Sequence, residues 1–114
     1  MWIRVAKHQS AIKIGQAGNR YIDGPLIEEF YFDEAVAEAL DADQFLLEMW
    51  EKLQAMFDWG DCDYFEADRC KKLYTWVSER LCKDISPAIR PVYEVMQEYS
   101  ALAVRLNTGM YFDF

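Results

Sequence analysis

The longest regular pattern in the chain is an apolar stripe in its last third. Apolar side chains follow one another at spacings of 4, 3, 4, 3, 4 and 3 residues, the period of one buried helix face about six turns long. Gly109, after Asn107 and Thr108, supplies a stop. We therefore predict that a helix through this stripe is the central core element. Its apolar positions are Ile85, Ile89, Val92, Met96, Tyr99, Ala103 and Leu106.

Two further stripes of the same period predict helices on its N-terminal side. One lies in residues 66–83, where acidic residues begin the segment and basic residues end it, as the helix dipole favours. The other ends at Gly60. Their apolar positions are Cys70, Leu73, Val77 and Leu81 in the first, and Leu46, Trp50, Leu53 and Phe57 in the second. Asp33 suits an N-cap before residues 34–40, which either continue as one long helix broken near Asp41 or form the first of two.

Alternating apolar residues predict strands at both ends of the chain. Residues 2–7 and 11–14 fit the two strands of a hairpin, and residues 110–114 would add a third strand to it. Residues 26–32 are ambiguous, although their aromatic content favours an extended piece. The expected fold is mainly α, with three to four helices packed around a central C-terminal helix. A small antiparallel β element from the N-terminal hairpin and C-terminal strand completes a single domain of residues 1–114.

Negative charge is concentrated in the middle of the chain. The whole protein carries 20 acidic and 12 basic residues, a formal net charge of −8. Fifteen of the acids lie between Asp23 and Asp68 beside a single base, Lys52, which gives this stretch a formal charge of −14. Because self-repulsion of that size destabilises a compact state, its presence suggests a positively charged partner. We expect that partner to be a protein, with no direct contact to nucleic acid.

Carboxylates and aromatic rings alternate most densely between residues 58 and 68. Trp and Tyr are enriched at binding hot spots, and carboxylates around them would steer a basic surface into place. Phe65 is expected instead to close the core between two helices. We interpret this segment, together with two glutamates of the preceding helix, as the partner-binding site. Its candidate residues are Asp58, Trp59, Asp61, Asp63, Tyr64, Glu66, Asp68, Glu48 and Glu51.

The sequence lacks the patterns that common metal and catalytic sites require. A calcium-binding loop that starts at Asp58 or Asp61 would place Cys62 or Phe65 where an oxygen ligand is needed. Zinc would need a cluster of Cys and His, and nothing in the pattern brings the single histidine, His8, near a cysteine. We therefore predict a protein with no metal site, no cofactor and no enzymatic activity.

Part of the second half of the chain resembles a known family. Tyr64-Phe65 leads into a helix that contains Trp76, and the tail reads Glu98-Tyr99-Ser100-Ala101-Leu102-Ala103-Val104-Arg105-Leu106-Asn107-Thr108-Gly109. In these features the chain resembles the small acidic immunity proteins that bacteria make against their own toxins. The resemblance covers less than half of the chain and carries no functional residue across. It implies a cognate toxin domain as partner, a cytoplasmic location and no catalysis.

The expected function is therefore that of an immunity-type inhibitor, which neutralises a cognate bacterial toxin through an acidic surface. Nucleases are the natural targets, because their cationic clefts bind the phosphate backbone. Three alternatives stay open: an acidic phage-type inhibitor that imitates DNA or blocks a CRISPR effector, a small enzyme or ligand-binding domain with an aromatic pocket, and a structural module. Exposed Trp and Phe side chains could also serve a homodimer. No apolar run has the length of a membrane span, so we expect a cytoplasmic protein without membrane contact.

Overall fold

The computed structural model describes residues 1–16 and 26–114, with side chains described up to Ile12 and from Leu26. Asp23, which belongs to the acidic stretch, lies outside the described residues. Along the chain the elements are β1 (Trp2–Ala6), α1 (Gln9–Gln16), β2 (Ile27–Tyr31), α2 (Glu34–Ala42), α3 (Phe45–Leu53), β3 (Cys62–Glu66), α4 (Ala67–Leu81), α5 (Arg90–Leu106) and β4 (Gly109–Asp113).

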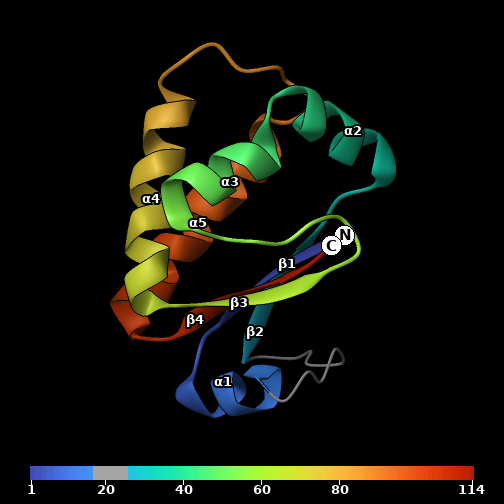
Figure 1. Cartoon of the computed structure of the whole chain (residues 1–114). Coiled ribbons are helices and arrows are strands. Elements are labelled where there is room, and N and C mark those ends of the chain that lie inside the picture. The colour runs from blue at the N-terminus through green and yellow to red at the C-terminus, as the bar shows by residue number, and fades with distance from the viewer. Residues whose placement is uncertain (17–25) are drawn as a thin grey trace.

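The four strands form one antiparallel sheet in the order β2-β1-β4-β3. Its two central strands come from opposite ends of the chain, and Trp2 of β1 faces Asp113 of β4 across the ladder. Helices α2 to α5 lie on one face of the sheet, and α1 lies on the other (Figure 1). The expected pairing of the C-terminal strand with the N-terminal one is confirmed.

The prediction of a mainly α fold is wrong, because the molecule is a mixed α/β structure with a four-stranded sheet. Residues 62–66 form β3, and their charge hid the alternation: Phe65 is buried in the core, whereas Tyr64 and Glu66 point to the opposite face. The predicted hairpin of residues 2–7 and 11–14 is also wrong, because residues 11–14 belong to α1. The amide of Ser10 donates to Nδ1 of His8 and that of Ala11 to the His8 carbonyl, so the chain turns into α1.

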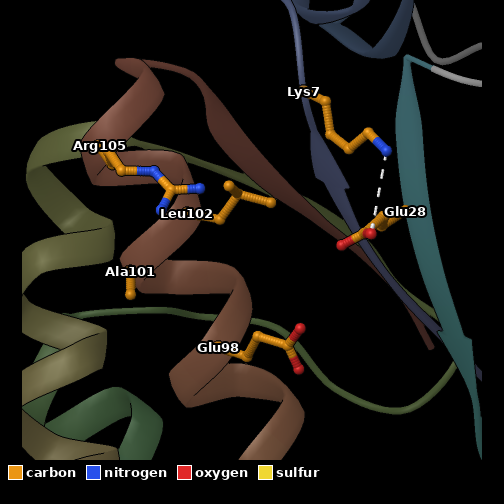
Figure 2. A pocket seen from close by; sticks show the side chains of 6 residues that line it. All are labelled: Lys7, Glu28, Glu98, Ala101, Leu102 and Arg105. Atoms are coloured by element: carbon orange, nitrogen blue, oxygen red, sulfur yellow. Dashed lines mark ion pairs between the residues drawn. The ribbon is translucent and has the colours of Figure 1, made fainter.

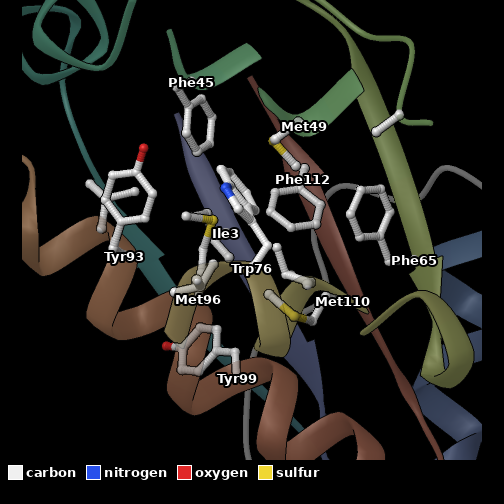
Figure 3. Packing of buried hydrophobic residues seen from close by; sticks show 14 of the residues in the cluster. Ile3, Phe45, Met49, Phe65, Trp76, Tyr93, Met96, Tyr99, Met110 and Phe112 are labelled. Atoms are coloured by element: carbon white, nitrogen blue, oxygen red, sulfur yellow. The ribbon is translucent and has the colours of Figure 1, made fainter. Parts of the chain in front are cut away.

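Helix α5 is the central core helix that the sequence predicts. Its buried face includes Val92, Met96, Tyr99 and Ala103, and it packs against α4, β1 and β4. Figure 3 shows this face meeting side chains of the sheet such as Ile3, Phe65, Met110 and Phe112.

Helix α3 buries a different face from the predicted one. Its buried residues are Phe45, Met49 and Leu53, and Trp50 is 42% exposed. The Phe45 ring occupies the aromatic centre of the core, 6.0 Å from Tyr93 and 6.1 Å from Trp76 between ring centroids. Burying Phe45 turns the helix by about one residue, or 100°, and leaves Trp50 outside. Among the described helices, none is both long enough and apolar enough to cross a membrane.

Candidate protein-interaction surface

The outer face of α2 carries a row of three carboxylates. Glu34, Glu38 and Asp41 are spaced four and three residues apart, so they lie on one side of the helix over about 10 Å. All three are exposed, and none forms an ion pair with a base in the described part of the chain. Like charges at this spacing repel one another. The row is therefore a feature that helix stability alone does not favour.

Helix α2 is fixed at its N-terminus by the predicted cap. Oδ1 of Asp33 accepts a hydrogen bond of 3.1 Å from the amide of Val36, which satisfies one of the free donors of the first turn. Glu34 in that turn also complements the helix dipole. The buried side chains Ala37 and Leu40 hold the opposite face against the core, so the carboxylates point to solvent.

The loop between α3 and β3 brings two of the predicted carboxylates to the same place. The amide of Asp58 donates to Oδ2 of Asp61 at 2.9 Å, and the amide of Asp61 donates to the carbonyl of Asp58 at 3.1 Å. Gly60 permits this tight turn through its φ of 96°. The side chains of Asp58 and Asp61 are thus held on the rim of a closed turn.

Trp59 joins this loop to α2. Its Nε1 donates to Oδ1 of Asp41 at 3.0 Å, and its ring stacks on Phe45 at 6.1 Å between centroids and lies 5.1 Å from Phe114. Trp59 is therefore half-buried and anchors the surface, and its part in partner binding stays a prediction. We call the five carboxylates that it brings together the acidic ridge: Glu34, Glu38, Asp41, Asp58 and Asp61.

The other candidates on and after β3 lie apart from the acidic ridge. Asp63 faces Arg69, with 3.7 Å between its Oδ2 and Nη1 of the arginine. Tyr64 packs against Tyr111 on the far face of the sheet, 5.0 Å between centroids. Exposed Glu66 and Asp68 follow at the opposite end of β3, about 16 Å along the strand from the ridge. The candidate residues thus do not form one surface.

Helix α3 holds the remaining two candidates, and exposed apolar side chains lie on this helix and just after it. Glu48 accepts a hydrogen bond of 3.1 Å from Nε1 of Trp76, whereas Glu51 is exposed. Leu47 is 49% exposed and Trp50 42%, and Met56, just beyond the helix, is 81% exposed. We call these three residues the apolar patch. Exposed Trp and Met beside carboxylates are typical of protein-binding surfaces.

The bases whose side chains the structure describes neutralise only a minority of the acidic stretch. Among its fourteen described carboxylates, four form ion pairs: Glu28 with Lys7, Glu29 with Arg4, Asp43 with Arg80 and Asp63 with Arg69. The other ten, which include the whole acidic ridge, have no basic partner in the described residues. The ridge therefore keeps its negative field toward solvent.

Cys70 and His8, two side chains that could carry nucleophilic chemistry, lie outside the acidic ridge. Burial raises the pKa of the Cys70 thiol to about 12, so this group stays protonated and unreactive at neutral pH. His8 is exposed, and its Nδ1 lies 2.9 Å from the hydroxyl of its neighbour Ser10. No three His, Cys, Asp or Glu side chains gather into a metal site within the described ranges 1–12 and 26–114.

No protein-family model, curated protein or solved structure matches this chain. The surface is therefore interpreted from its own geometry. The sequence interpretation missed Glu34, Glu38 and Asp41, although their spacing of four and three residues was the signal that places them on one helix face. It also missed the exposure of Trp50, which a regular apolar stripe had assigned to the core.

Proposed function

We propose that this protein is an immunity-type inhibitor, which binds a basic surface of a cognate bacterial toxin in the cytoplasm. The observation that supports this proposal is the acidic ridge, five exposed carboxylates from α2 and the α3–β3 loop without a basic partner among the described residues. Complementary charge accelerates association and selects the partner more than it adds affinity. The apolar patch would supply contact area, since Trp and Met are enriched in interface cores.

A nuclease toxin fits this surface because its substrate cleft must be cationic. A protein that occupies such a cleft excludes the phosphate backbone without any chemistry. Detailed imitation of DNA fits less well. The three α2 carboxylates span about 10 Å, whereas a duplex presents about one charge per 1.7 Å of its axis. We therefore favour shape-specific binding to one toxin over general mimicry of DNA.

The proposal is tested by co-expression with candidate toxin domains from the neighbouring reading frames, and by measuring the Kd of each purified pair. A ridge variant combines Glu38→Lys with Asp58→Asn and Asp61→Asn, since asparagine keeps the oxygens that cap the turn. The matched control, Glu66→Lys with Asp68→Lys, makes the same net charge change of four outside the ridge.

We expect wild-type protein to restore growth and its Kd to rise steeply with salt. The ridge variant should weaken binding by about 100-fold, and the control by less than about threefold. Equal losses in the two variants would mean that only overall charge matters. No growth rescue by the wild-type protein would reject the proposed function.

A further inference from the structure

The exposed face of α5 carries opposite charges on either side of a small residue. Glu98, Ala101 and Arg105 are spaced three and four residues apart, so they form one row along the helix, which we call the α5 row. All three are exposed. Figure 2 shows Glu98 and Arg105 projecting from α5, with Ala101 and Leu102 between them along the helix. The α5 row is therefore negative at Glu98 and positive at Arg105, and the short side chain of Ala101 leaves a low point between them.

Hollows flank the α5 row on both sides. One, of about 630 Å³, lies between α5 and the sheet and includes Lys7 and Glu28 in its wall. The other, of about 420 Å³, lies between α5 and α4 and includes Tyr74, which is 42% exposed. Ala101 and Arg105 line both hollows. A rod-like element could therefore lie beside α5 and contact α4 or the strands.

Among the described residues, Glu98 and Arg105 have no ion-pair partner, unlike the charges around them. Lys7 lies 3.9 Å from Glu28, and Arg90 lies 3.6 Å from Glu94 on the same helix. Neither Glu98 nor Arg105 lies within ion-pair distance of an opposite charge in the part of the chain that the structure describes. Two complementary charges on one face thus stay available to an outside partner.

We propose that a second copy of this chain docks on this face, with the two α5 helices antiparallel around a two-fold axis. A two-fold contact is self-complementary: if residue i meets residue j, then j of the first copy meets i of the second. An axis between Ala101 and Leu102 places Glu98 of each copy opposite Arg105 of the other, because the two positions lie equally far from it. Both unpaired charges then find partners in one arrangement.

Of the two side chains beside the axis, Ala101 is small and Leu102 is half-buried in the hollow toward the sheet, so a close approach is sterically feasible. Interaxial distances of packed helices are about 8–10 Å and depend on the side chains at the crossing, so Ala101 favours the short end of this range. Tyr74, together with Leu106 at 38% exposure, adds apolar area beside the charged pairs. This surface shares no residue with the acidic ridge or the apolar patch. Self-association and partner binding can therefore succeed or fail independently.

The test measures the dimer dissociation constant of the full chain by sedimentation equilibrium. Glu98→Arg makes the α5 row wholly positive and Arg105→Glu makes it wholly negative. Each variant alone should therefore have a dimer dissociation constant about tenfold higher than that of the wild type. An equimolar mixture of the two should associate again. The double exchange, Glu98→Arg with Arg105→Glu, should restore the dimer. Glu51→Arg is the matched control, because it makes the same charge change at an exposed position of α3, outside this face, and it should leave association unchanged.

Circular dichroism and thermal melting of each variant confirm that the monomer is folded. A wild-type protein that stays monomeric up to millimolar concentration would overturn the proposal. Dimers that persist in Glu98→Arg and in Arg105→Glu would also overturn it, by assigning self-association to another face. Recovery of association in the mixture supports the antiparallel two-fold arrangement, since only reciprocal contacts between positions 98 and 105 explain it.

Discussion

The indole N–H of Trp59 donates a hydrogen bond of 3.0 Å to Oδ1 of Asp41, across 18 residues of chain. This contact fixes the α3–β3 loop against the end of α2. Two segments that are separate in the sequence thereby present their carboxylates together. The acidic ridge depends on this bond for its shape, since the loop residues Asp58 and Asp61 form no other described side-chain bond to α2.

Replacing Trp59 by phenylalanine should therefore loosen the ridge without removing any of its charges. The variant keeps an aromatic ring over Phe45 but loses the hydrogen bond, so we expect a loss of about 0.5–1.5 kcal/mol in the free energy of unfolding. Urea denaturation measures this change. Asp41→Asn is the control, because its amide oxygen still accepts the bond. A similar loss in both variants would mean that the charge of Asp41, and not the bond, stabilises the loop.

Reversing one charge on α2 should make the free protein more stable. Glu38 lies one turn from Glu34 and from Asp41, so Glu38→Lys replaces two repulsions by two attractions. Pairs of this kind contribute about 0.2–0.5 kcal/mol each, and we expect the midpoint of thermal unfolding to rise by a few degrees. Glu38→Gln should give about half of the gain. A lower midpoint in the lysine variant would contradict an exposed, repulsive row.

Tyr93 stabilises the junction of α2, α4 and α5 through its hydroxyl. It donates to Oδ2 of Asp43 at 2.9 Å, while Arg80 donates to the other oxygen of the same carboxylate. Tyr93→Phe should cost about 1–2 kcal/mol, because a partly buried charged acceptor loses one donor. Tyr99→Phe is the matched control: the hydroxyl of Tyr99 has no hydrogen-bond partner within the described residues, so its removal should change stability by less than about 0.5 kcal/mol.

Stability should fall in alkaline solution, beginning with Cys70. Burial raises the pKa of its thiol from about 9 to about 12, and burial also raises the pKa of Tyr99 from 10.0 to about 12. Above pH 9 the unfolded chain loses the thiol proton that the folded protein retains, so folding is progressively disfavoured until the folded pKa is reached. The expected slope from Cys70 is about 1.4 kcal/mol per pH unit. Denaturation series between pH 8 and 11 measure it.

Cys70→Ala separates this effect from that of the tyrosines. The variant should decline less steeply than the wild type between pH 9 and 10, although its stability will be lower throughout because a buried side chain is shortened. The decline that remains comes from the tyrosines, whose pKa values burial also raises, and it should steepen near pH 10, where tyrosines of the unfolded chain ionise. An unchanged slope between pH 9 and 10 would mean that Cys70 does not titrate in this range.

Gly109 in β4 has no room for a side chain, and adding a methyl group there should be destabilising. A Cβ at this position would lie 2.5 Å from the ring of Tyr64 and 2.6 Å from the carbonyl oxygen of Phe65. The backbone oxygen cannot move away cheaply, so we expect Gly109→Ala to cost about 1–3 kcal/mol in urea denaturation. Gly60→Asn is the contrasting case, because its site is open and the cost comes only from the positive φ, which asparagine adopts more readily than most residues. Its cost should lie at or below the lower end of that range.

Long periodic stripes predicted helices well, and tertiary packing decided the rest. The stripe from Ile89 to Ala103 is long enough that only one face of α5 can be buried. In α3, a shift of one residue buries either Phe45 or Trp50, and only the ring neighbours of Phe45 in the fold settle the choice. Local periodicity contains no information about those neighbours.

Strand β3 and the acidic ridge could not be recognised from local pattern for related reasons. Five residues that include Asp63 and Glu66 read as a charged loop, and only pairing with β4 makes them a strand. The ridge joins residues of two segments, and the bond from Trp59 to Asp41 that unites them is a long-range contact. The charge of the region was readable in advance, whereas the particular carboxylates that share a surface were not.

The order of strands also bears on how the protein is made. Since β4 lies between β1 and β3, neither of those strands has its inner partner until residues 109–113 leave the ribosome. A nascent chain interrupted earlier would present unpaired strand edges, which are templates for aggregation. Productive folding should therefore wait for residues 109–113, and translation arrest shortly before Gly109 should yield a product that proteases remove.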